Sequence, residues 1–143
     1  MSDSPPPCFF DTNILIYAVA EDHPERTAIA QDLVRRMADA GLARVSTQTL
    51  QEFYVTATLK VQKRLSSDQA LRYLEQMARW GPLTLDYPIV REAALLSQAH
   101  RLSFWDSLII VAAARSGARR LYTEDLQHGR KIFGVEIVNP FRD

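Results

Sequence analysis

Four acidic side chains occupy the places in this 143-residue sequence where short apolar segments end or where helices begin. Asp11 directly follows an apolar run of three residues, and Asp125 follows a predicted strand. Glu52 lies early in one predicted helix, and Asp106 lies in the first turn of another. Several carboxylates in one place repel one another, so a shared site needs a cation. The pattern indicates a centre for Mg²⁺ or Mn²⁺, hard ions that prefer oxygen ligands. Such an ion can activate water and stabilise the charge that develops on a phosphodiester.

Each of these acids also has an ordinary structural interpretation. An acid in the first turn of a helix is stabilised by the helix dipole. Two pairs fit the spacing of a capping box, Ser103 with Asp106 and Thr49 with Glu52. Asp11 is harder to explain as a cap, because its apolar segment runs straight into it. The combination of four acids therefore favours a functional site over four separate caps.

Short strands alternate with longer helices along the chain. Strands are predicted at residues 8–10, 42–46, 82–86, 119–123 and 135–138. Apolar spacing of three to four residues predicts helices over 12–19, 25–40, 50–61, 67–80, 88–100, 104–116 and 124–133. This alternation is typical of an α/β domain with a mostly parallel sheet. Ligands of such sheets bind beyond the carboxyl ends of the strands, where these acids are expected.

Composition places limits on the function. The length is that of one domain, which we assign to residues 1–143, with residues 1–7 as a short polar tail. Seventeen basic residues balance seventeen acidic ones, so binding of nucleic acid must use a local patch. Cys8 is the only cysteine, which excludes an internal disulfide. We expect a cytoplasmic protein, because neither a signal peptide nor a membrane span is visible.

Four segments, taken in order, resemble the motifs of PIN domains. FFDTNILIYA resembles the opening motif, in which an aspartate at the end of the first strand precedes Thr or Ser and then Asn. STQTLQEFYVTATLK resembles the second acidic motif, with Glu52 as its acid. LSFWDSLIIVAAA and LYTEDLQHG resemble the third and fourth, with Asp106 and Asp125 as their acids. The resemblance covers about residues 8–140, and the length is similar to that of VapC-type toxins.

The resemblance implies a three-layer α/β/α fold with a mostly parallel sheet of four or five strands. It also implies a Mg²⁺- or Mn²⁺-dependent endoribonuclease that forms homodimers, acts on RNA and is silenced by a small antitoxin. Asp11, Asp106 and Asp125 would then be metal ligands, and Glu52 would be a further ligand or would orient the attacking water. Supporting hydrogen bonds are expected from three residues, Thr12 and Asn13 toward Asp11 and Thr123 toward Asp125.

Other polar and aromatic residues near these motifs are not expected to be metal ligands. Glu124 is expected to point away from its neighbour Asp125 on a helix, and Asp86 is interpreted as a loop residue. Trp105 could stack on an RNA base, although packing at the start of a helix is the favoured interpretation. Aromatic residues of the helix pair at 48–79 suggest a groove for an amphipathic helix, with core packing as the alternative: Phe53, Tyr54, Tyr73 and Trp80.

Two rival functions remain to be weighed. A phosphatase of the haloacid-dehalogenase type would use Asp11 as a nucleophile, but it needs an aspartate where this chain has Asn13. A catalytically silent PIN-fold module could instead bind RNA or a protein without cutting it. The presence of all four acids argues against a loss of catalysis, and a cleavage assay with a metal titration separates the two.

Overall fold

The computed structural model describes residues 4–142 of the chain. Its helices are α1 (Thr12–Val19), α2 (Pro24–Asp39), α3 (Thr47–Leu59), α4 (Ser67–Ala78), α5 (Tyr87–His100) and α6 (Phe104–Arg115). Its strands are β1 (Cys8–Phe10), β2 (Ala43–Arg44), β3 (Arg120–Tyr122), β4 (Lys131–Ile132) and β5 (Val135–Val138). Residues 1–3 of the predicted tail lie outside the described residues, and the carbonyl of Pro7 accepts a hydrogen bond from Arg119 N at 2.9 Å.

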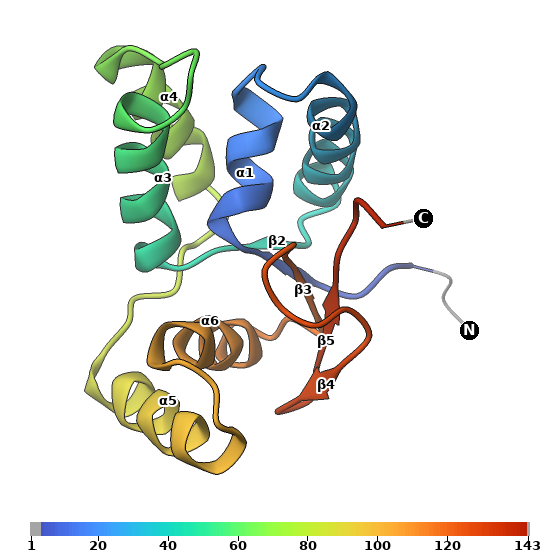
Figure 1. The fold of residues 1–143 in the computed structure, drawn as a ribbon, viewed down its shortest axis with the longest axis vertical. Helices are drawn as coiled ribbons and strands as arrows, with labels where there is room; N and C mark the ends of the chain where they lie inside the picture. Colours follow the sequence, from blue (N-terminus) through green and yellow to red (C-terminus); the bar gives the residue numbers. More distant parts are fainter. Residues whose placement is uncertain (1–3, 143) are drawn as a thin grey trace.

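The strands form one sheet in the order β2-β1-β3-β5-β4. β1 pairs in parallel with β2 and β3, and β3 pairs in parallel with β5, whereas β4 runs antiparallel to β5. Helices α1 to α4 lie on one side of this sheet and α5 and α6 on the other (Figure 1). These features confirm the predicted α/β/α architecture with a mostly parallel sheet.

The two faces of the sheet are covered by separate apolar cores, because successive side chains of a strand point to opposite faces. Phe9 and Leu121 pack with α5 and α6, whereas Cys8, Phe10 and Tyr122 pack with α1 to α3. Burial raises the pKa of the Cys8 thiol to about 12, in agreement with its interpretation as an inert core residue. Helices therefore pack against both faces of the sheet, and this packing fixes the positions of the strand ends.

The register of β1 and β3 places the two motif-bearing strand ends together. Phe10 is paired with Tyr122, so Asp11 and Thr123 leave the sheet side by side. The backbone N–H of Asp11 continues the ladder by donating to the Tyr122 carbonyl at 3.0 Å. Parallel α/β folds bind their ligands in the crevice beyond this edge, where the strands have their carboxyl ends.

Two predicted elements are absent from the structure within residues 4–142. The predicted strand at 82–86 is wrong, because only Leu83 forms a single parallel bridge, with Ser46. The predicted helix at 124–133 is also wrong, since the chain forms a loop and then strand β4. Gly129 has a φ of +86°, and its N–H donates to the Ile137 carbonyl at 2.8 Å, so β5 takes the place of helical bonding.

The helices were compared with the length and apolar character of a membrane span. Within residues 4–142, none of them has both the length and the apolar character that crossing a bilayer requires.

Candidate active site

Asp11 is a buried carboxylate held by two hydrogen bonds at the start of α1. It is the N-cap of that helix, and its Oδ1 accepts from Thr12 N at 2.7 Å. Its Oδ2 accepts from the Thr123 hydroxyl at 2.8 Å. The side chain is thus fixed in one orientation, and only 7% of the residue is exposed.

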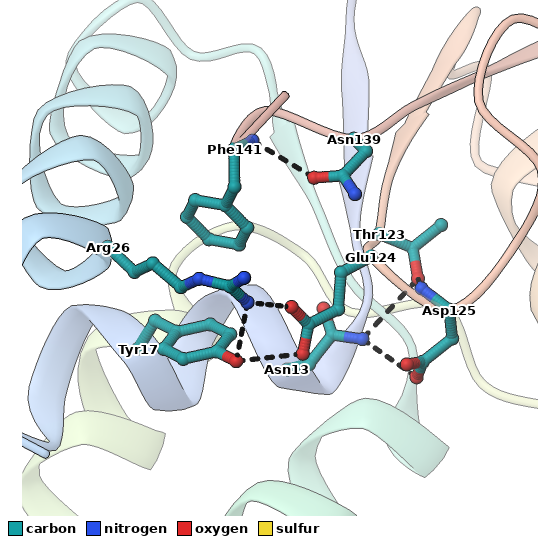
Figure 2. Close-up of polar contacts among 8 residues, drawn as sticks. All are labelled: Asn13, Tyr17, Arg26, Thr123, Glu124, Asp125, Asn139 and Phe141. Carbon is teal, nitrogen blue, oxygen red and sulfur yellow. Dashed lines mark hydrogen bonds and ion pairs between the residues drawn. The ribbon is translucent and has the colours of Figure 1, made fainter. Parts of the chain in front are cut away.

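The Thr123 hydroxyl connects Asp11 to Asp125. While it donates to Asp11, it accepts from the backbone N of Asp125 at 3.1 Å and from Asn13 Nδ2 at 3.4 Å. Asn13 Nδ2 also donates to Asp125 Oδ2 at 2.8 Å, a bond marked by a dashed line in Figure 2. The predicted helper Thr123 therefore braces both acids, whereas Asn13 orients Asp125 rather than Asp11.

The environment of Asp11 disfavours its charged form. Burial is the main cause, and it raises the pKa of this carboxyl from 3.8 to about 6. The hydrogen bonds from Thr123 and Thr12 lower the pKa, while the negative charges of Asp125 and Glu52 raise it further. A cation placed among these three carboxylates would favour their ionised forms.

Asp11, Glu52 and Asp125 line one cavity of about 400 Å³ at the carboxyl edge of the sheet. Its walls come from Asp11 and α1, from the α1–α2 loop, from α3 and the two residues after it, and from the segment after β3. The remaining lining residues are Thr12, Asn13, Ile16, Tyr17, Ala20, Asp22, His23, Thr56, Lys60, Val61 and Glu124. Three of the four predicted acids, from distant parts of the sequence, are therefore brought together.

Glu52 is not a capping residue. The capping box of α3 is formed by Ser46 and Thr49, so the helix starts earlier than the Thr49–Glu52 spacing suggested. Glu52 lies beyond the first turn, is exposed, and lines the same cavity as Asp125. Its interpretation as a cap is therefore wrong.

Asp106 is placed differently from the other three acids. It lies partly buried in the first turn of α6, where its backbone N donates to Ser103 Oγ at 3.0 Å. It is not among the residues that line the cavity of Asp11, Glu52 and Asp125. Within residues 4–142, no three acidic, histidine or cysteine side chains already surround a single ion position.

Two lesser sequence interpretations can be compared with the structure. Asp86 is more than a loop residue, because its carboxylate caps α5 by accepting from Ile89 N at 3.3 Å. Trp105 is 64% exposed and lies edge-on to Phe104, with ring centroids 5.3 Å apart. Its indole is therefore accessible to a stacking partner.

A second polar network beside the acids was missed by the sequence analysis. Glu124 lines the cavity together with Asp125, because the helix predicted at 124–133, which would have pointed it away, does not form. Its carboxylate accepts from Tyr17 Oη at 2.9 Å and forms an ion pair with Arg26. Tyr17 follows Asn13 by four residues on α1, which puts both on one helix face. This spacing could have indicated Tyr17 as a residue of the site. No sequence signal indicated Arg26.

Asp22 is a further acid on the cavity wall, but it is committed to the backbone. Its carboxylate accepts from Gln62 N at 3.1 Å and from Lys63 N at 3.3 Å. It thereby fastens the loop after α3, next to Lys60, to the α1–α2 loop. Asp22 is a structural residue of the wall rather than a candidate ligand.

The donor set of the cavity suits a hard divalent ion. Mg²⁺ usually keeps several waters and binds through one or two carboxylates, so three converging acids are not required. Asp11 and Asp125, joined by Thr123, provide such a pair. Thr12 Oγ1 and Asn13 Oδ1 also belong to residues of the lining and are buried oxygens without a hydrogen-bond partner in the described chain. Oxygen donors without a competing partner are what such an ion needs.

Comparisons with known proteins agree with this architecture. The family model described as PIN domain matches residues 8–133. A solved structure, a toxin–antitoxin complex from Klebsiella pneumoniae, is similar to this chain with a TM-score of 0.68 and 20% sequence identity. The match covers 95% of this chain and 99% of that chain, and at this identity it shows the fold alone. No curated protein sequence matches the chain.

Proposed function

This chain belongs to the PIN-domain family, whose members are generally nucleases, and we propose that it is a metal-dependent endoribonuclease that hydrolyses RNA phosphodiester bonds. The single observation that carries the proposal is the coupling of buried Asp11 to Asp125 through Thr123 at the acidic cavity. A buried carboxylate whose pKa is raised to about 6 is costly to the fold, which is typical of a functional site.

Asp11 and Asp125 would hold a Mg²⁺ or Mn²⁺ ion. When bound, the ion would activate water and stabilise the charge developing on the phosphate. Thr123 fixes the two carboxylates relative to each other, and Asn13 orients Asp125. Glu52, which lines the same cavity, is suited to orient the attacking water or to serve as a further ligand. A ligand role for Asp106 rests on the resemblance of its motif.

We further propose that the enzyme is a toxin that forms a homodimer and is silenced by a small helical antitoxin. The homodimer rests on the resemblance to VapC-type toxins. The helical partner is supported by an apolar hollow of about 470 Å³ bounded by α1 to α4. Phe53, Tyr73 and Trp80 line it and also pack in the core on this side of the sheet, whereas Tyr54 does not line it. A hollow of this kind fits the apolar face of an amphipathic helix.

A cleavage assay with single-stranded RNA tests the nuclease proposal. Wild-type protein is incubated with Mg²⁺, with Mn²⁺ or with excess EDTA, in parallel with Asp11→Asn and the control Glu75→Gln, which alters an exposed acid of α4. We expect cleavage only with a divalent ion, loss of cleavage in Asp11→Asn, and wild-type activity in the control. RNA binding without cleavage under every condition would instead favour the silent module.

A further inference from the structure

We propose that Arg26 is a substrate-positioning residue that binds an RNA phosphate next to the scissile bond. This inference rests on the proposed ribonuclease function, and it adds a contact that lies outside the acidic motifs. It starts from the network around Arg26, Tyr17 and Glu124, which joins the beginning of α2 to the rim of the acidic cavity.

The guanidinium group of Arg26 is held in place by four contacts. Its Nη1 donates to Tyr17 Oη at 3.0 Å and to Glu124 Oε2. Its Cζ lies 5.3 Å from the centre of the Tyr17 ring and 5.1 Å from that of Phe141. Figure 2 shows the guanidinium group between the two rings. A cation between two aromatic rings loses little further freedom when it binds a ligand.

The same group borders the cavity and keeps donors for a ligand. Both of its hydrogen-bond partners, Tyr17 and Glu124, are lining residues. Within residues 4–142 every hydrogen bond of Arg26 runs through Nη1, so Nε and Nη2 have no protein partner. The side chain is 45% exposed, which leaves these donors accessible. The planar fork of a guanidinium matches the oxygens of a phosphate.

Electrostatics explain why a cation is needed here. The chain has no net charge, so no overall field draws a polyanion toward the site. The lining includes five acids, which repel RNA in the absence of cations: Asp11, Asp22, Glu52, Glu124 and Asp125. Arg26 offsets the charge of Glu124 and extends beyond it into solvent. Lys60, at the end of α3, is a basic residue of the lining itself.

The experiment compares Arg26→Met and Arg26→Lys with wild type and with Arg36→Ala. Met keeps the aliphatic stem against Tyr17 and Phe141 but removes the charge, and thermal melts verify that the variants fold. Arg36 is the matched control, because it lies on the same helix and pairs with Asp32 at 2.9 Å, and Asp32, unlike Tyr17 and Glu124, does not line the cavity. Cleavage of a single-stranded RNA is followed with Mn²⁺, and binding of the same RNA is followed in EDTA over a salt series.

We expect Arg26→Met to raise KM about tenfold, with kcat within about twofold of wild type. The slope of log binding constant against log salt should become shallower by about 0.7, the value for one lost phosphate contact on a single strand. Arg26→Lys should restore the slope and part of KM. Values for Arg26→Met that match those for Arg36→Ala would overturn the proposal, as would a fall in kcat with unchanged KM and slope. A wild type that cleaves nothing would refute the nuclease function separately, and the salt series would still report on Arg26.

Discussion

The Thr123 hydroxyl donates to Asp11 Oδ2 at 2.8 Å, and this bond joins the ends of the neighbouring strands β3 and β1. The same oxygen accepts from the backbone N of Asp125 at 3.1 Å. One buried side chain therefore sets the positions of two candidate ligands. The arrangement follows from the register in which Phe10 is paired with Tyr122, so the fold itself builds the acid pair.

Replacing Thr123 with valine should separate the two acids while keeping the volume of the side chain. Cleavage should fall about 10–100-fold, the usual effect of losing a group that orients metal ligands. The free energy of unfolding should fall by about 1–3 kcal/mol, because Asp11 and the Asp125 N–H lose a buried partner. Thr123→Ser should retain most of the activity. Thr58→Val is the control, since its hydroxyl bonds only the Tyr54 carbonyl within α3, at 2.7 Å. Full activity in Thr123→Val would refute the bracing role.

Stability should depend on pH through Asp11. Its pKa is about 6 in the folded protein and near 3.8 in the unfolded chain, so the folded state binds the proton more tightly. Relative to Asp11→Asn, the wild type should therefore lose stability as pH rises from about 4 to 6 and then level off, with an upper bound of about 3 kcal/mol. Saturating Mn²⁺ at pH 7.5 should raise the free energy of unfolding of the wild type but not that of Asp11→Asn. Urea melts at several pH values measure the difference in unfolding free energy between the two proteins. A difference that does not change with pH would contradict the raised pKa of Asp11.

Asp106→Asn tests the one predicted acid that lies outside the cavity lining. The Ser103 bond uses the backbone N of Asp106 and survives the change. Loss of the charge at the start of α6 should cost about 0.3–1 kcal/mol in EDTA. We expect cleavage to be lost and the stabilisation by Mn²⁺ to be smaller, as for a ligand. Retained cleavage with an unchanged response to Mn²⁺ would show that Asp106 only stabilises its helix.

The apolar hollow should be required for the partner and not for catalysis. Ala38 lies in it on α2, whereas Ala78 is exposed on α4 outside it. Ala38→Glu should abolish copurification of a helical partner encoded beside the gene and leave RNA cleavage by the isolated protein intact. Ala78→Glu should change neither. Partner binding that survives Ala38→Glu would place the interface elsewhere.

The parts of the site that follow from local sequence pattern were predictable. The apolar segment ending at Asp11 and the Thr-x-Asp spacing of Thr123 and Asp125 define strand ends, and the parallel sheet brings them together. The loop and short strand at 124–133 were not predictable from apolar spacing, because their backbone is held by β5 through contacts such as Gly129 with Ile137. Arg26 was not predictable either, since its partner Glu124 is 98 residues away and comes close only through that loop.

The end groups of RNA fragments test the central claim most directly. Single-stranded RNA is digested by the wild type with Mn²⁺, and the fragments are identified by mass spectrometry. Hydrolysis by a carboxylate-held ion predicts 5′-phosphate and 3′-hydroxyl ends, formed only when the divalent ion is present. Fragments ending in a 2′,3′-cyclic phosphate, or equal cleavage in excess EDTA, would contradict it, because attack by the RNA's own 2′-hydroxyl would then be the reaction.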